Sequence, residues 1–250
     1  MKQFFTIAVV LLSLQLYGQK KIVWFDMGAK VQYGAAGLYN SAIANSNGYD
    51  YNISTGYSYG GKLGINFGYS GLAIDVMRST AKQEFEKTGS TTVPTVNWQA
   101  WDVYALFRNA KNLGYFEIGP KISFVNKVED NFIEGGVVNP TGAVTDRTTN
   151  YNKTNIAGVI GFGANIMGND GAFSGILGLR FEYSFTDFVG PEGATTGANG
   201  VNAPLRDASV YADGYKMSNV AFAGLVFELN WGIGYFAKAQ CGARSKFIMF

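Results

Sequence analysis

Residues 57–76, YSYGGKLGINFGYSGLAIDV, decide the fold of this chain. In the first half of the stretch, every second residue apart from one glycine is apolar or aromatic. Polar residues or glycine, including Lys62, fill the positions between. After the short connection 68–71, the alternation resumes with Asp75 between apolar neighbours. Alternation of period two is typical of a β-strand that turns one face to an apolar environment and the other to a polar one. The stretch therefore predicts two antiparallel strands joined by a tight turn.

The same alternation recurs along the chain in segments of roughly ten residues, each bounded by residues typical of turns or loops. The segments that we predict as strands are 23–33, 57–67, 72–76, 101–108, 116–124, 155–166, 177–185 and 221–231. The sixth segment is nearly all apolar or glycine, so its pattern does not fix which side chains share a face. A single alternating segment could belong to a soluble sandwich, but eight of them favour a barrel.

The connections between these strands alternate in length. Four are long, polar and rich in glycine, asparagine or threonine, and three are short: 34–56, 86–96, 129–152 and 187–217, against 68–71, 109–112 and 168–171. This sorting is typical of outer-membrane barrels, in which short turns face the periplasm and long loops face outside. We therefore predict an all-β fold, an eight-stranded antiparallel transmembrane β-barrel with four long extracellular loops and three short periplasmic turns. A lipocalin-like soluble barrel is the alternative.

Composition favours the membrane barrel. Charged residues make up 15% of the chain, against about 25% in an ordinary domain, and a soluble protein with so few would expose too few solubilising groups. Tryptophan and tyrosine residues near the predicted strand ends fit the aromatic girdles of a membrane protein, although aromatic residues are also good strand formers. These residues are Trp24, Tyr33, Tyr57, Tyr59, Trp98, Trp101, Tyr183 and Trp231.

The N-terminus predicts export. Lys2 supplies a positive start, the apolar run 4–16 is shorter than the ~20 residues of a membrane-spanning helix, and Gly18 is a small residue at the predicted cleavage point. The expected organisation is a signal peptide at 1–18, an outer-membrane β-barrel at 19–231, and a C-terminal tail or displaced last strand at 232–250.

Three segments carry a family resemblance: LGYFEIGPKISFV at 113–125, NIAGVIGFGANI at 155–166 and ILGLRFEYSFTDF at 176–188. They resemble the closing strands of the small outer-membrane β-barrel domain family, which includes the transmembrane part of OmpA and the PorT-like barrels. The resemblance spans about 22–231 and implies an eight-stranded barrel in the outer membrane of a Gram-negative bacterium. It brings no catalytic residue set. Barrels of this family usually end on an aromatic residue of the last strand, whereas here residues 232–250 follow the last predicted strand.

Charged residues on the inward face of the predicted strands form the candidate site. The six acids and five bases are Asp26, Asp75, Asp102, Glu117, Glu182 and Glu228, with Lys30, Lys62, Arg108, Lys121 and Arg180. An eight-stranded barrel is just wide enough for side chains to fill it, and isolated buried charges are very costly. Near balance of the two signs favours a salt-bridged plug, because a selective pore would show mostly one sign. The alternative is a gated polar pathway. By position, Arg180 could pair with Glu182 on its own strand, and Asp102 with Lys121 across two strands.

Several chemistries are not expected. The chain has no histidine, which excludes Ser–His and Cys–His mechanisms and removes the commonest metal ligand. Its glycine-rich segments lack the strand–loop–helix context of phosphate loops. We therefore expect no enzyme activity, cofactor, metal or nucleic-acid partner. The expected role is structural or surface interaction through the extracellular loops, and the alternative is a narrow pore or an accessory barrel of a transport or secretion system. Expected partners are outer-membrane lipid, the barrel-assembly machinery, and an unnamed extracellular ligand or secretion-system protein.

Overall fold

A computed structural model describes residues 23–46, 48–87, 92–111, 113–131, 139–168, 172–191, 215–237 and 246–249. The predicted signal peptide at 1–18 lies outside the described residues. Within them, no helix is both long enough and apolar enough to cross a membrane.

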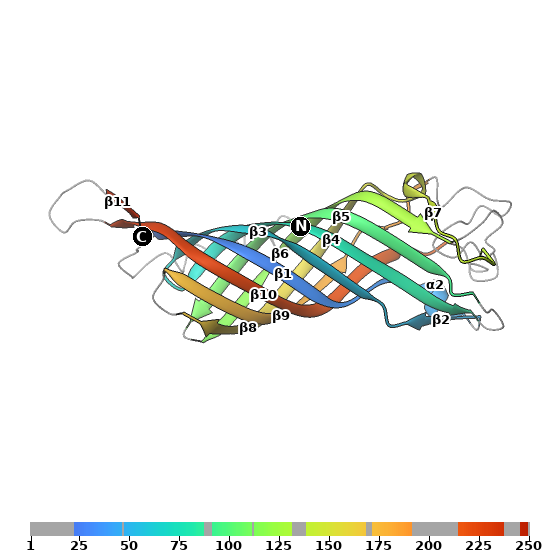
Figure 1. Ribbon diagram of the computed structural model, residues 1–250, viewed down its shortest axis with the longest axis horizontal. Helices are drawn as coiled ribbons and strands as arrows, with labels where there is room; N and C mark the ends of the chain where they lie inside the picture. The colour runs from blue at the N-terminus through green and yellow to red at the C-terminus, as the bar shows by residue number, and fades with distance from the viewer. Residues whose placement is uncertain are drawn as a thin grey trace, which may run out of the picture.

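Eight long antiparallel strands form a closed ring (Figure 1). They are β1 (Val23–Asn40), β3 (Thr55–Phe67), β4 (Ser70–Lys87), β5 (Thr95–Lys111), β6 (Gly114–Asp130), β8 (Thr154–Met167), β9 (Phe173–Ser184) and β10 (Ser218–Ala237). Each strand pairs with its neighbour in this order, and β1 also pairs with β10 along its whole length. A sheet whose first and last strands pair is a barrel. The ring confirms the predicted all-β, eight-stranded antiparallel architecture.

Short elements lie at the two ends of the ring. They are α2 (Ser41–Ala44), β2 (Tyr49–Asn52), β7 (Thr145–Asp146), the 3-10 turn η2 (Thr148–Asn150) and β11 (Lys246–Met249). All but β11 lie at the end of the ring that carries the long connections. There β2 pairs with β4, and β7 pairs with β6. β11 pairs with the last four residues of β10 at the opposite end (Figure 1).

Two of the short turns reverse the chain at a glycine. Gly68, between β3 and β4, has φ 68°, and Gly168, after β8, has φ 69°. This left-handed conformation is open to glycine at little cost and unfavourable for residues with a Cβ. A glycine at these two positions therefore allows the tight reversals that the sequence predicted.

The strands reach further toward the long loops than the sequence predicted. The prediction of a loop at 34–56 is wrong for its first residues, because β1 continues to Asn40. The remaining residues of this segment include the short elements α2 and β2. Backbone pairing with β10 carries β1 through Gly34 and Gly37, where small residues give no apolar alternation. The predicted loops 86–96 and 129–152 are likewise trimmed by the ends of β4, β5 and β6.

The last strand is also longer than predicted. Its predicted end was near Trp231, whereas β10 continues to Ala237. Trp24 and Phe25 of β1 pair with this added part on one side, and β11 pairs with it on the other. Residues 232–237 therefore continue the barrel strand, and 246–249 add a short strand beside it.

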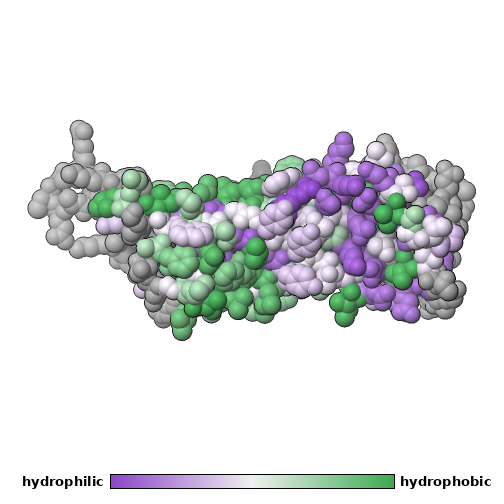
Figure 2. Space-filling view, viewed as in Figure 1, coloured by the Kyte–Doolittle hydropathy of each residue, from purple (hydrophilic) through white to green (hydrophobic). Residues whose placement is uncertain are grey.

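The outer surface changes character along the barrel. From the short turns upward, outward residues are apolar and exposed, for example Leu63, Ile74 and Ile160. They end in an aromatic belt, which we define as Tyr33, Tyr57, Tyr59, Trp101, Phe124, Tyr183 and Phe185. Beyond the belt, outward residues of β4, β5 and β6 are polar, for example Lys82 and Asn97. Figure 2 shows this division into a hydrophobic and a hydrophilic part. We call the two parts the short-turn half and the long-loop half.

The interior of the long-loop half contains an apolar core, with buried polar residues such as Gln83 and Asp130 beside it. Its buried hydrophobic side chains form one cluster, the upper core: Leu38, Ile43, Tyr49, Phe85, Val96, Trp98, Val128, Tyr151, Phe188 and Val189. The prediction that Trp98 belongs to an exposed girdle is wrong. Trp98 is 5% exposed, and its ring centroid lies 5.5 Å from that of Phe188. The inward face of β5 continues from Asp102 toward the long loops, and Trp98 lies on it.

Candidate functional site: the charged lumen

All eleven charged residues of the predicted lumen set lie inside the short-turn half, and none is more than 8% exposed. They alternate along the strands with the outward apolar residues, as Lys62 does with Leu63. β8 contributes no charge and instead turns Ala157, Val159 and Gly161 inward. A Cβ at Gly161 would lie 2.8 Å from Cγ of Glu117. Small residues on β8 therefore leave room for the long side chains opposite.

Four acids and four bases form one cluster, which we call the lower cluster: Asp26, Lys30, Lys62, Asp75, Arg108, Glu117, Arg180 and Glu228. Glu228 is its hub. The carboxylate of Glu228 lies 2.9 Å from Nζ of Lys30, 3.0 Å from Nζ of Lys62 and 2.7 Å from Nη2 of Arg108. Lys62 also pairs with Asp26 at 2.9 Å.

Arg180 crosses the lumen rather than pairing along its own strand. Its Nε donates to Oε1 of Glu117 at 2.6 Å, and its Nη2 lies 3.3 Å from Oδ2 of Asp75. Lys30 holds the same Asp75 oxygen at 2.5 Å. The predicted partner Glu182 is engaged elsewhere, so the expected Arg180–Glu182 pair is wrong. Glu117 lies level with Arg180 across β8, where Gly161 leaves room between them.

A second group, the upper cluster, consists of Asp102, Lys121, Glu182 and Tyr104. Nζ of Lys121 lies 3.1 Å from Asp102 and 2.6 Å from Glu182, so the predicted Asp102–Lys121 contact is present. The hydroxyl of Tyr104 donates to Glu182 at 3.1 Å. The group holds two acids and one base, whereas the lower cluster is balanced.

Two neutral side chains, Gln32 and Tyr104, connect the lower cluster to the upper cluster. The predicted lumen set named only charged residues and therefore omitted both. Gln32 donates to Glu182 at 3.3 Å and accepts from Nη1 of Arg180 at 3.3 Å. The ring of Tyr104 contacts two cations, with its centroid 4.8 Å from the guanidinium of Arg180 and 5.4 Å from Nζ of Lys121. Cation–π contacts of this kind stabilise desolvated cations. Both residues stand at inward positions of the alternation, which is the signal that could have found them.

The two ends of the lumen differ. At the short-turn end, a cavity of about 360 Å³ reaches the lower cluster at Asp26, Lys62 and Arg108. Five buried polar atoms without a hydrogen-bond partner belong to side chains that line it: Oδ1 of Asp26, Nδ2 of Asn66, Nε of Arg108, Oδ1 of Asn165 and Oδ1 of Asn230. A polar cavity of this size holds several waters. At the other end, the upper core lies between the charges and the long loops.

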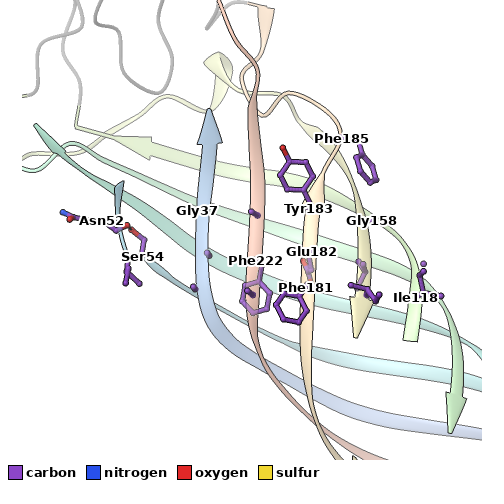
Figure 3. A pocket seen from close by; sticks show the side chains of 18 residues that line it. Gly37, Asn52, Ser54, Ile118, Gly158, Phe181, Glu182, Tyr183, Phe185 and Phe222 are labelled. Atoms are coloured by element: carbon purple, nitrogen blue, oxygen red, sulfur yellow. The ribbon is translucent and has the colours of Figure 1, made fainter. Parts of the chain in front are cut away.

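A larger hollow of about 720 Å³ borders β1, β6, β8, β9 and β10 near the aromatic belt. Figure 3 shows the residues that line it, with the rings of Phe181 and Tyr183 between Gly37 on one side and Gly158 on the other. Its one charged lining residue is Glu182, which the upper cluster already holds. The hollow therefore adds no second set of groups to the charged lumen.

The lumen is a dense set of ion pairs in which most bases contact two or more acids. Replacing water around so many charges is costly, and it is tolerated only when each charge has close partners. Every base of the lumen set has such partners.

No family model and no curated protein matches this chain. Among solved structures, the translocator domain of the autotransporter NalP from Neisseria meningitidis is similar over 92% of this chain and 95% of that chain, at 9% identity and a TM-score of 0.27. The fold described above rests on the strand pairings of this chain and not on that likeness.

Proposed function

We propose that this chain is a non-enzymatic outer-membrane β-barrel protein of a Gram-negative bacterium. In this proposal its own side chains plug the lumen, and its long-loop half serves a structural or surface-interaction role outside the cell. The observation that carries the proposal is the reversed burial of the short-turn half, where apolar side chains face out and charged ones face in.

Reversed burial is unfavourable in water. Each Å² of apolar surface left in water forgoes roughly 25 cal/mol, and outward residues such as Leu63, Leu72 and Ile74 are 55–64% exposed. In a bilayer the same surface meets hydrocarbon, and a closed ring satisfies every backbone hydrogen bond of its strands. The aromatic belt fits the level where amphipathic rings favour the interface. Lipid and the barrel-assembly machinery are the partners that such a barrel needs.

The lengths of the connections support the orientation. In bacterial barrels the short turns face the periplasm and the longer loops face outside. The polar surface and apolar core of the long-loop half suit a part that stands in water.

A plugged lumen is supported by the paired charges and by the upper core above them. A narrow pore or an accessory barrel of a secretion system is the second candidate, and the cavity at the short-turn end favours it. Planar-bilayer recording separates the two. We expect almost no conductance, whereas a stable, large and ion-selective conductance would promote the pore.

Cell fractionation tests the membrane location. We expect the protein in the outer-membrane fraction, and we expect the folded, unheated form to migrate faster on gels than the boiled form. Recovery from the soluble periplasm without detergent would overturn the proposal.

A further inference from the structure

Arg78 is the first outward charged residue of β4 above the apolar surface. Below it the outward residues are Leu72, Ile74 and Val76, and above it they are Thr80, Lys82, Glu84 and Glu86. On the neighbouring strands Arg78 lies opposite Tyr59 and Trp101, two members of the aromatic belt. The residue therefore stands at the boundary between the two halves.

The side chain of Arg78 leans toward the polar side of this boundary. Its Nη2 donates to Oε1 of Gln99 at 2.7 Å, and its guanidinium carbon lies 5.7 Å from the ring centroid of Trp101. Gln99 is the next outward residue of β5 toward the long loops. A long cationic side chain at a membrane boundary extends in this way, with its stem along apolar surface and its charge toward the headgroups.

Arg78 differs from its outward neighbours in its charge partners. Lys82 pairs with Glu84 at 2.7 Å, and Lys127 pairs with Glu129 at 2.8 Å. Within the described ranges, no carboxylate lies within ion-pairing distance of Arg78. Each of these paired lysines therefore carries its own counter-ion on the sheet, whereas Arg78 presents an uncompensated positive charge.

The side chains around Arg78 also favour an anion. Tyr57, Tyr59, Thr80 and Trp101 carry O–H or N–H donors and no negative charge. Oε1 of Gln99, the nearby strong acceptor, is already engaged by Arg78 itself. A guanidinium with free donors matches a phosphate group, which it can bind through two parallel hydrogen bonds.

We propose that Arg78, together with Tyr59 and Trp101, binds the phosphate group of an anionic lipid in the leaflet that faces the long loops. The site rests on the proposed function, because a lipid headgroup reaches Arg78 only if the short-turn half lies in a bilayer. Charge complementarity selects the occupant, and the neighbouring apolar surface of Ile74 and Val76 accommodates its acyl chains.

Trp101 provides a built-in reporter for this lipid. The full-length protein is reconstituted in phosphatidylcholine vesicles in which an equal small fraction of lipid carries brominated chains, either on phosphatidylglycerol or on phosphatidylcholine. Bromine quenches a tryptophan it touches, and the difference from a Trp101→Phe variant gives the Trp101 signal. We expect the lipid beside Trp101 to favour phosphatidylglycerol about fivefold, the effect of one basic residue at a membrane surface.

Arg78→Gln should remove this preference and leave it near one, whereas Arg78→Lys should keep part of it. Lys82→Gln is the matched control, since it removes a cation from the same face of β4 that is already paired, and it should keep the full preference. Equal preference in the original protein and Arg78→Gln would overturn the site. Loss of the preference on adding inorganic phosphate would do the same, because it would show a site for free anions.

The two hypotheses fail in different ways. If neither brominated lipid quenches Trp101 or Trp231, the short-turn half is not in the bilayer and the proposed function fails. If both lipids quench Trp101 equally, the membrane location stands and only the phosphate site is refuted.

Discussion

The two halves of the barrel obey opposite rules of burial. In the long-loop half, Phe85 and Val96 are inside and Lys82 and Asn97 are outside, as in a water-soluble protein. In the short-turn half, Asp75 is inside and Ile74 is outside. The same strands, β4 and β5, run through both halves, so the backbone is common to the two arrangements. The difference shows that strand geometry alone does not set which side chains face in.

The halves should also respond differently to the same kind of substitution. Apolar interior packing is sensitive to lost volume, and a charged interior is sensitive to a lost partner.

Removing Arg180 should have the largest effect. Arg180→Ala leaves both Asp75 and Glu117 short of a partner in a site that is 0% exposed at Arg180, and breaking such a buried pair costs about 3–5 kcal/mol. Urea unfolding of the reconstituted protein measures the loss. Lys82→Gln, which breaks an exposed pair, should cost less than about 1 kcal/mol. Equal losses for the two variants would mean that lumenal water screens the charges.

Truncating a leucine tests the upper core. Leu38→Ala opens a cavity at a residue that is 1% exposed, and the free energy of unfolding should fall by about 2–5 kcal/mol. Leu72 is exposed on the outer surface. If that surface lies in a bilayer as proposed, lipid fills the space left by Leu72→Ala, and the loss should stay below about 1 kcal/mol. The same unfolding assay applies. A larger loss at Leu72 would contradict the assignment of the apolar surface to hydrocarbon.

An added outward charge distinguishes the two surfaces. Leu63→Arg places a guanidinium on the apolar surface and should destabilise the folded barrel by about 2–4 kcal/mol. Asn97→Arg places it on the polar surface and should change stability by less than about 0.5 kcal/mol. Both variants are compared by unfolding and by the fraction that remains compact on unheated gels. Similar behaviour of the two would place Leu63 in water.

The smallest effect concerns alkaline pH in the long-loop half. Burial raises the pKa of Tyr51 from 10.0 to about 12, and its hydroxyl donates to the carbonyl oxygen of Asn40 at 3.0 Å. The neutral phenol is favoured by folding, so its stabilising contribution is complete below pH 10 and is lost as the pH rises through 12. The stability difference between the original protein and Tyr51→Phe should therefore shrink across that range. A difference that is constant with pH would show that Tyr51 is not buried.

Period-two alternation predicted the ring well wherever the two faces meet different environments. It placed Asp75 and Glu117 inside because each stands between two outward apolar residues. It failed to extend β1 past Gly34, since residues 34–37 are all glycine or alanine and carry no contrast between faces. Strand length there depends on pairing with β10, which a local pattern does not report.

The partners inside the lumen could be predicted only between adjacent strands. Asp102 and Lys121 lie on neighbouring strands, and their contact followed from adjacency alone. The contact of Arg180 with Asp75 crosses the lumen, and its contact with Glu117 reaches past β8. Both depend on the stagger between strands, which alternation leaves undetermined. The packing of the upper core could not be predicted from alternation either, because Ile43, Tyr49 and Phe188 come from connections and short elements far apart in the sequence.

The seam between β1 and β10 has a consequence for how the chain folds. Val23–Asn40 pairs with Ser218–Phe236, so the contacts that close the ring join residues that are almost the whole barrel apart in sequence, and topologies rich in such contacts fold slowly. Until they form, two strand edges stay unpaired, and the charges of the lumen have an open side. Glu228 of β10 brings the partner that Lys30, Lys62 and Arg108 share. Pairing of the last strand thus closes the backbone ring and balances the charges of the lower cluster in one step, so we expect a half-assembled barrel to be unstable.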